Sequence, residues 1–282
     1  MSESNPTLPS TPAAPKQRAW RIWQALTMPL FYPTFGLGCL LMLVLTGYAQ
    51  LRFRSAQKRV IWLRAALSRI ARAWLGWGVT LGLLRHDVIR QDAQDQVGGG
   101  LVVVANHPSL VDVIFVLAEL PQLSCVLKAD LGSIPVLSTL ARKLNYLSNN
   151  DPELVLEEGA RRLANGESLL IFAEGTRTKS RNGMDFRLGA AELALRAQVP
   201  VRPVVIHYHG RYLSGLGRWY EFPEQQLHYT VEVGALINQP IASAATQRRA
   251  LRRQFNARLE QYFDRRLSRG VASSQPAPKV AA

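Results

Sequence analysis

The stretch from Ile22 to Leu51 constrains this chain more than any other, because it holds no charged residue over thirty consecutive positions. A helix that crosses a bilayer needs about 20 predominantly apolar residues, so this stretch is long enough to enter a membrane. Pro29 and Pro33 interrupt its first half and predict a kinked span, or a re-entrant or interfacial helix with a break near Tyr32–Pro33. A buried helix of a soluble protein is the alternative. We expect membrane attachment.

Charge is unevenly distributed along the chain. Of the net charge of +14, residues 51–90 carry +8 and residues 248–269 carry +6, whereas residues 91–247 are nearly neutral. Basic flanks of this kind are expected to contact a polyanionic surface. No nucleic-acid-binding module is recognisable, so we expect an anionic membrane surface and no nucleic acid as partner. More Lys and Arg follow the apolar stretch than precede it, which predicts that its downstream side faces the cytoplasm.

Two further segments have helical periodicity. Ile61–Leu84 mixes large apolar residues with arginines, which is typical of a basic amphipathic helix at the headgroup interface, although a helix packed on the protein core shows the same pattern. Ala245–Leu267 has an apolar residue at every fourth position of its second half and predicts a last helix on the core or on lipid. The expected segments are a tail at 1–21, membrane-associated helices at 22–84, a central domain at 85–240, a basic amphipathic helix at 241–269 and a tail at 270–282.

Short β-rich runs alternate with helix-like segments between the basic flanks. This alternation predicts a single α/β domain with a mixed, mainly parallel sheet flanked by helices, preceded by the N-terminal membrane-associated helical segment. The expected strands are Leu101–Ala105, Ser124–Lys128, Asn145–Ser148, Leu169–Phe172, Val201–Tyr208 and Tyr229–Leu236. The expected helices are Ser109–Leu120, where Ser109 and Asp112 have the spacing of a capping box, Ile134–Lys143, Pro152–Ala164 and Gly189–Gln198.

Several common kinds of site have no counterpart in the sequence. Cys39 and Cys125 cannot form a disulfide framework, and no Cys/His cluster has the spacing of zinc ligands. The GxSxG, HExxH, Walker A and Rossmann glycine motifs are absent as well. We therefore expect a reducing compartment and look for the chemistry in other polar clusters.

The first such cluster follows the first expected strand. His107 lies in a strand-to-helix turn, and Asp112 follows five residues later, inside the first expected helical turn. Asp112 can fold back onto the imidazole, and a His–Asp dyad supplies a base with a fixed tautomer and a stabilised imidazolium. Such a base suits the deprotonation of an alcohol during acyl transfer. A turn histidine beside a helix-capping aspartate is the structural alternative.

The second cluster follows the expected strand Leu169–Phe172. Gly175 lets the backbone approach a ligand, Thr176 offers a hydroxyl, and Arg177 offers a planar fork of donors for phosphate. A polar turn with an ion pair between Glu174 and Arg177 is the alternative. Two charged turns at strand ends are what a ligand crevice in an open α/β sheet requires.

Three blocks of the sequence, taken together, resemble a known family. His107-x4-Asp112 comes first, Phe172-Ala173-Glu174-Gly175-Thr176-Arg177 follows, and Val199-Pro200-Val201-Arg202-Pro203-Val204 comes last. They are similar in order and spacing to blocks I, III and IV of the glycerolipid acyltransferases, the PlsC-like 1-acylglycerol-3-phosphate acyltransferase family. The resemblance covers about residues 85–240, which it identifies as an acyltransferase catalytic domain.

The resemblance implies a membrane-bound enzyme that transfers a fatty acyl group to the free hydroxyl of a lysophospholipid. The donor is acyl-ACP or acyl-CoA, and the expected acceptor is 1-acylglycerol-3-phosphate, which gives phosphatidate. His107 becomes the general base and Asp112 orients it, with no metal, cofactor or covalent enzyme intermediate. The catalytic domain is expected on the cytosolic face of the cytoplasmic (inner) membrane. The expected substrate-binding residues are Glu174, Gly175, Thr176, Arg177, Lys128, Pro200 and Pro203.

The chain departs from the family pattern at block II, where a strand usually ends with an arginine that helps to hold the acceptor phosphate. Asn149 and Asn150 lie in that region. Loss of such a contact removes a charge-assisted hydrogen bond of about 1.5–3 kcal/mol. Lys128, or Lys179 and Arg181, can compensate for it.

Three hypotheses are therefore open. The first is acyl transfer to lysophosphatidate, and the second is the same chemistry on an acceptor without phosphate, as in similar proteins that acylate ornithine lipids, glycolipids or specialised polyene lipids. The third is a non-catalytic membrane-binding protein that keeps the fold, against which the intact His107 and Asp112 argue.

Overall fold

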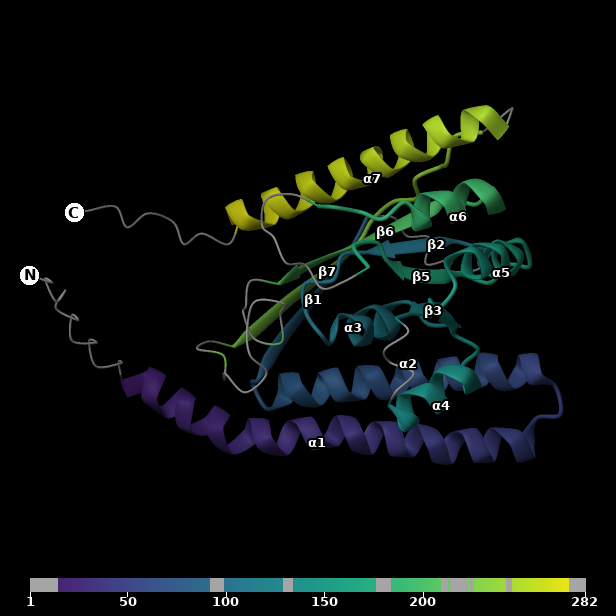
Figure 1. Ribbon diagram of the computed structural model, residues 1–282. Coiled ribbons are helices and arrows are strands. Elements are labelled where there is room, and N and C mark those ends of the chain that lie inside the picture. Colours follow the sequence, from purple (N-terminus) through teal and green to yellow (C-terminus); the bar gives the residue numbers. More distant parts are fainter. Residues whose placement is uncertain are drawn as a thin grey trace, which may run out of the picture.

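The structure is a computed structural model that describes residues 15–91, 99–128, 134–175, 184–208, 213, 223, 226–241 and 245–273. A seven-stranded sheet runs through its centre in the order β1-β7-β6-β2-β5-β3-β4 (Figure 1). Neighbouring strands are parallel except β6 and β7. The predicted α/β domain with a mixed, mainly parallel sheet is confirmed. The strands are β1 (Leu84–Arg90), β2 (Val102–Ala105), β3 (Ser124–Leu127), β4 (Leu147–Ser148), β5 (Leu169–Phe172), β6 (Val201–Tyr208) and β7 (Leu227–Val233).

The strand order brings distant parts of the chain to one edge of the sheet. β2 lies between β6 and β5, with Ala105 opposite Val204 on one side and opposite Phe172 on the other. β3 and β4 continue the sheet beyond β5. Because β2, β5, β3 and β4 are parallel, their carboxyl ends meet along one edge, where ligands bind in open α/β sheets. His107 after β2 and Glu174 after β5, the described parts of the two polar clusters, therefore lie side by side.

Helices cover both faces of the sheet (Figure 1). Successive β2 residues point to opposite faces, so that Val103 and Ala105 join one core cluster and Val102 and Val104 the other. The first face is covered by α2 (Ala56–Thr80) and α3 (Asp112–Glu119), with α1 (Pro15–Arg52) beside α2 and α4 (Pro135–Lys143) against α1. The second face is covered by α5 (Pro152–Ala164), α6 (Gly189–Ala197) and α7 (Ala245–Ser273).

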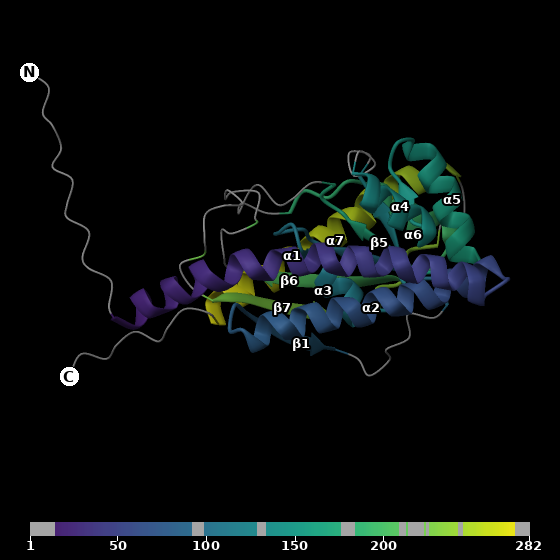
Figure 2. The same ribbon diagram turned by 90° about the horizontal axis from the view of Figure 1, so that it is seen from below.

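The N-terminal helix is continuous through both of its prolines. α1 runs unbroken past Pro29 and Pro33, so the alternative with a break near Tyr32–Pro33 is wrong and the other, a continuous helix, remains. Each proline removes a helical hydrogen bond, but α1 lies along α2, as Figure 2 shows. Phe31 stacks on Trp74 of α2 with the ring centroids 4.5 Å apart. This tertiary packing stabilises the helix where its own hydrogen bonds are missing.

The second helix packs on the protein core. Leu63, Ala71 and Leu75 of α2 are buried, so the core-packed alternative for Ile61–Leu84 describes this helix better than a position wholly at the headgroup interface. α2 ends at Thr80, and Leu84 begins β1, a strand that the sequence analysis did not assign. β1 is an edge strand whose arginines are exposed. Its sequence, LRHDVIR, mixes charged and apolar residues without the strict alternation that marks a strand.

Several element boundaries differ from the predicted ones; β4, for example, begins at Leu147 rather than Asn145, and β7 spans Leu227–Val233 rather than Tyr229–Leu236. α1 begins at Pro15 rather than near Ile22, and α7 continues to Ser273, so both helices extend into segments predicted as tails. α3 begins at Asp112 rather than at Ser109, and before it the backbone N–H of Leu110 donates to the carbonyl of Leu213 at 2.9 Å.

Candidate active site

Strand β2 and the residue after it fix the position of His107. β2 is a run of fully buried apolar residues, Val102–Ala105. The buried side chain of Asn106 then bonds to β6: its Nδ2 donates to the Ile206 carbonyl at 2.9 Å, and its Oδ1 accepts from the Ile206 N–H at 2.7 Å. These two bonds fix the backbone where it leaves the sheet, and so they fix the position of His107.

His107 and Asp112 form the expected dyad. His107 Nδ1 lies 2.9 Å from Asp112 Oδ2, and the imidazole stacks on Phe172 with the ring centroids 4.3 Å apart. The Asp112 side chain is fully buried, whereas 21% of the His107 side chain is exposed. With the proton placed on Nδ1, the ring donates to the carboxylate and Nε2 keeps a free lone pair. No partner for Nε2 occurs among the described residues.

Asp112 accepts two more hydrogen bonds, both from Ser109. The backbone N–H donates to Oδ2 at 2.6 Å and the hydroxyl to Oδ1 at 2.5 Å. The predicted capping box is thus half formed, because the Ser109 hydroxyl bonds the carboxylate and not a backbone N–H. Burial raises the pKa of Asp112, whereas the bonds from His107 and Ser109 oppose this rise by favouring the charged form.

A tyrosine that the sequence analysis did not select extends this hydrogen-bond chain. The hydroxyl of Tyr229 on β7 donates to Ser109 Oγ at 3.1 Å. Tyr229 is 1% exposed and stacks between Phe115 and Tyr208, with centroid distances of 4.2 and 4.4 Å. The chain of bonds therefore runs from β7 through Ser109 and Asp112 to the imidazole. No motif signals it, because Tyr229 and Ser109 are 120 residues apart in sequence.

The turn after β5 supports the turn after β2. Glu174 Oε1 accepts the backbone N–H of His107 at 3.0 Å. Gly175 has φ +66°, a conformation that favours glycine. A Cβ on Gly175 would lie 2.6 Å from Arg187 Nε, so this glycine makes room for the guanidinium of Arg187.

Arg187 is a second site residue that the sequence analysis missed. Its backbone N–H donates to the Ala173 carbonyl at 2.8 Å, and its side chain is exposed. In the part of the chain that the structure describes, the Arg187 guanidinium has no carboxylate partner. An arginine in this position is a planar donor for phosphate or carboxylate oxygens. Only the fold places it beside Gly175.

Lys128 and the amides of block II lie on the same edge of the sheet. Lys128 is exposed and follows β3, which pairs with β5. The N–H of Asn149 donates to the Leu127 carbonyl at 2.8 Å, so the backbone of Asn149 lies next to that of Lys128. Asn149 and Asn150 are exposed. The edge thus gathers the dyad, Glu174, two cations and two amides from four successive strand ends.

Other predicted site residues are not brought to this point. Pro200 precedes β6 at the opposite edge, where its carbonyl accepts the Val102 N–H at 3.2 Å. Pro203 lies on the face covered by α7, next to Gly234. Thr176, Arg177, Lys179 and Arg181 lie outside the described residues. Among the described residues, no three His, Cys, Asp or Glu side chains gather as a metal site would require.

Comparison with known proteins gives consistent matches. The model of the Acyltransferase family matches residues 86–207. A lyso-ornithine lipid O-acyltransferase of Brucella abortus is 30% identical over 189 residues, which cover 57% of this chain and 70% of that protein. A 1-acyl-sn-glycerol-3-phosphate acyltransferase of Pseudomonas aeruginosa is 30% identical over 128 residues, 43% of this chain and 49% of that protein. The crystal structure of the 1-acyl-sn-glycerophosphate acyltransferase PlsC from Thermotoga maritima shares the fold, with a TM-score of 0.68 and 20% identity over 92% of this chain and 99% of that chain.

Proposed function

Because this chain belongs to the PlsC-like family of glycerolipid acyltransferases, we propose that it transfers a fatty acyl group to a hydroxyl of a lyso-lipid, with His107 as the general base. One observation carries the proposal. The Nδ1 atom of His107 is held by the buried Asp112 at 2.9 Å while Nε2 is left open at the edge of the sheet. This is the arrangement that deprotonation of an alcohol requires.

The reaction then proceeds by direct transfer. Nε2 of His107 takes the proton of the acceptor hydroxyl as its oxygen attacks the thioester carbonyl, so that a C–O bond forms. The C–S bond breaks, and the leaving thiolate takes the proton back from the imidazolium. Asp112 keeps the Nδ1 proton in place and stabilises the positive charge that His107 carries between the two transfers. The co-substrate is an acyl thioester, acyl-ACP or acyl-CoA.

The first candidate acceptor is 1-acylglycerol-3-phosphate, which would give phosphatidate. Arg187 and Lys128 supply positive charge at the edge that also holds His107, and Arg177 is a further predicted contact. Guanidinium and ammonium groups bind phosphate oxygens by charge-assisted hydrogen bonds. Relatives named 1-acyl-sn-glycerol-3-phosphate acyltransferase support this acceptor.

The second candidate acceptor is a lyso-ornithine lipid, which has no phosphate. It is supported by Asn149 and Asn150, which lie where the family usually has a phosphate-binding arginine. It is also supported by three relatives named lyso-ornithine lipid O-acyltransferase, from Brucella abortus, Pseudomonas aeruginosa and Rhizobium meliloti. Glycolipids and polyene lipids belong to the same phosphate-free class.

We place the enzyme on the cytoplasmic (inner) membrane through α1, with the catalytic edge on the cytosolic side. One helix among the described residues, Ala19–Arg52, is long and apolar enough to cross a bilayer. Its large side chains are widely exposed, with 72% of Leu30, 65% of Leu37 and 69% of Val44 accessible. An apolar helical surface of this extent is expected to contact lipid.

Acyl transfer by the detergent-purified full chain tests the proposal. Acyl-ACP and acyl-CoA are each offered with lysophosphatidate and, in parallel, with lyso-ornithine lipid. His107→Ala should lower the rate by at least about 100-fold, because general-base catalysis contributes that much. His228→Ala is the matched control, because His228 is an exposed β7 histidine that bonds to Asp87. Unchanged transfer by His107→Ala would refute the assignment of the base.

Arg187→Ala distinguishes the two acceptors. If Arg187 binds a phosphate, the variant should raise KM for lysophosphatidate by about tenfold, the effect of one charge-assisted hydrogen bond. The KM for an acceptor with neither a phosphate nor a carboxylate, such as a lyso-glycolipid, should change little. Transfer to lyso-ornithine lipid alone would keep the His107 mechanism and select the second candidate.

A further inference from the structure

A cavity of about 1180 Å³ lies at the edge of the sheet opposite the catalytic dyad. Its walls are the end of α1, the first half of α2, the last turn of α4 and the loops that lead into β3, β4 and β5. Ser168 lines it immediately before β5, whereas Glu174 of the active site follows β5. At about 3.3 Å per extended residue, the two sites are about 20 Å apart. The cavity is therefore distinct from the acyl-transfer site and is as large as a small-molecule site.

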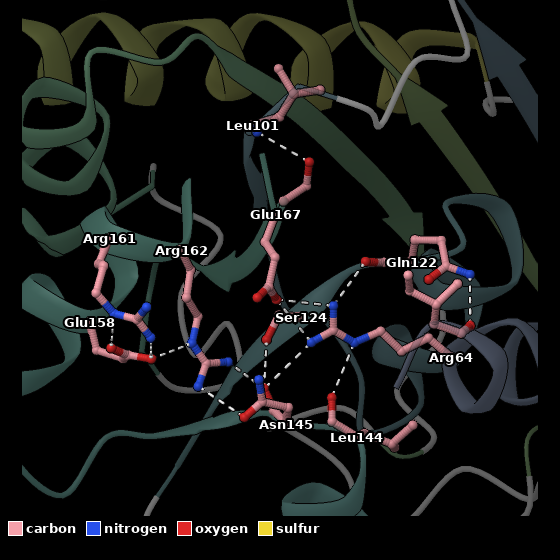
Figure 3. Close-up of polar contacts among 12 residues, drawn as sticks. Arg64, Leu101, Gln122, Ser124, Leu144, Asn145, Glu158, Arg161, Arg162 and Glu167 are labelled. Atoms are coloured by element: carbon pink, nitrogen blue, oxygen red, sulfur yellow. Dashed lines mark hydrogen bonds and ion pairs between the residues drawn. The ribbon is translucent and has the colours of Figure 1, made fainter. Parts of the chain in front are cut away.

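A buried arginine, Arg64, lines the cavity. Figure 3 shows its hydrogen bonds to the surrounding loops. The side chain of Arg64 is 5% exposed. Its Nε donates to the Leu144 carbonyl at 3.1 Å, and its Nη1 and Nη2 each lie 3.2 Å from Glu167 Oε2. Nη1 also donates to the Gln122 carbonyl at 3.3 Å. Arg64 thus ties α2 to the three loops, and Glu167 is neutralised.

The remaining charged groups around the cavity are all positive. Arg59, Arg142 and Lys143 line it, and Glu167 is the single acidic residue among the described lining residues. Arg59 donates to the Phe53 carbonyl and Arg142 to the Thr139 hydroxyl. In the part of the chain that the structure describes, none of these three cations has a carboxylate partner. A concave surface lined by one sign of charge concentrates ions of the opposite sign.

We propose that this cavity binds a phosphate ester of the glycerophosphate type. The three cations supply charge for the phosphate, and Gln50 and Gln57 supply amide groups for neighbouring hydroxyls. Ala56 and Gln57 also form the first turn of the long helix α2, whose N–H groups favour an anion and which has no acidic residue there. The site lies apart from the acceptor site and does not depend on the acyl-transfer chemistry.

The surroundings of the cavity suit the headgroup of a phospholipid. Leu51, Tyr48 and Ile61, around the α1–α2 connection, are 91%, 52% and 49% exposed. Tyr48 packs against Trp62, with the ring centroids 5.6 Å apart. Aromatic and basic residues together are typical of the membrane interface. A soluble glycerophosphate has the same phosphate chemistry, and the experiment below separates the two sources.

The test compares two double variants of the full chain that remove equal charge. Arg142→Ala with Lys143→Ala removes two exposed cations of the cavity, and Arg258→Ala with Arg265→Ala removes two exposed cations of α7 on the other side of the sheet. Binding is measured to phosphatidylcholine vesicles with and without about 30% phosphatidylglycerol, and separately to soluble glycerol 3-phosphate by calorimetry. Acyl transfer at saturating acceptor confirms that each variant is folded.

If the ligand binds in the cavity, the two double variants should differ in binding. The Arg142/Lys143 variant should lose about 25-fold in binding to the anionic vesicles, about fivefold per basic residue, while the α7 variant keeps wild-type binding. The same loss for soluble glycerol 3-phosphate would show that the phosphate ester alone is sufficient, and a loss confined to vesicles would identify a lipid headgroup. Equal losses in both double variants, or no loss in either assay, would overturn the proposal, because binding would then come from diffuse charge or from elsewhere.

Discussion

Replacing Asp112 by asparagine isolates the charge of the dyad from its geometry. Asparagine has the same volume, and its oxygen can take the place of Oδ2. There it accepts the hydrogen bonds that Asp112 Oδ2 now accepts from His107 Nδ1 at 2.9 Å and from the Ser109 N–H at 2.6 Å. Its NH2 group then donates to the Ser109 hydroxyl, which at present donates to Oδ1 at 2.5 Å. Two of the three hydrogen bonds keep their direction, and the third reverses if the Ser109 hydroxyl turns to donate to the Tyr229 oxygen. No cavity or clash is created, and the negative charge is lost.

The separation of the two groups sets the size of the effect. An imidazolium and a carboxylate 2.9 Å apart attract each other by about 6 kcal/mol at an effective dielectric constant of about 20. The amide dipole retains the hydrogen bond to His107 Nδ1 and with it about half of this attraction, so about 3 kcal/mol of stabilisation is lost when His107 is charged. That loss corresponds to a decrease of about 100-fold in kcat.

The assay is steady-state acyl transfer with the acceptor that the wild type uses, together with thermal unfolding of each variant. Asp151→Asn is the matched control, because Asp151 is an exposed aspartate that caps α5 by accepting from the N–H groups of Glu153 and Leu154, and asparagine caps a helix as well. The control should keep both kcat and the unfolding midpoint. A decrease of less than about threefold in the Asp112→Asn variant would mean that His107 is never charged in the rate-limiting step, which would refute the mechanism.

Three further predictions concern residues outside the dyad. Tyr229→Phe removes the hydroxyl at the far end of the hydrogen-bond chain to the Asp112 carboxylate and should lower kcat by about threefold to tenfold with KM unchanged; wild-type kcat would show that the tyrosine does not position the dyad. Arg64→Met leaves the half-buried Glu167 carboxylate and several carbonyls without their hydrogen-bond donor and should lower the free energy of unfolding by about 3 kcal/mol, whereas Arg69→Met, at an exposed position of the same helix, should change it by about 0.5 kcal/mol or less; equal denaturation midpoints would contradict this. The hydrogen bond to His207 lowers the pKa of Glu232 below its usual 4.5, so the ionised carboxylate stabilises the fold above that pH and the contribution is lost as the pH falls through the folded-state pKa. Glu232→Gln should therefore destabilise the protein by about 1–2 kcal/mol in urea at pH 7 and by less at pH 4, and a difference that grows on acidification would reverse the sign of the argument.

Features that depend on near neighbours in sequence could be predicted. The strands from Val102 to Phe172 follow from short apolar runs, and the cap at Asp151 with Pro152 in the first turn marks the start of α5. His107 and Asp112 are only five residues apart, so the dyad could be predicted from their spacing alone. Family membership also followed from the order of three local motifs.

Features that depend on long-range packing could not be predicted. The two prolines of α1 indicate a break when only the helix is considered, and it is the contact between Phe31 and Trp74 of α2 that keeps the helix whole. β1 is recognisable as a strand only through its pairing with β7, which comes more than a hundred residues later. Pro200 precedes a strand that is parallel to β2, so it lies at the edge remote from His107.

The sequence by itself therefore determined the α/β class, the apolar first helix and the histidine that we propose as the general base. The tertiary structure decided which groups surround that histidine: Glu174 on its backbone, Tyr229 behind Ser109, and Arg187 beside Gly175. It also assembled the cationic cavity from the ends of three helices, α1, α2 and α4, and three loops. The reason is physical, because helix and strand propensities, turns and capping act over a few residues, whereas strand order and the burial of one helix on another are settled by the packing of the whole core.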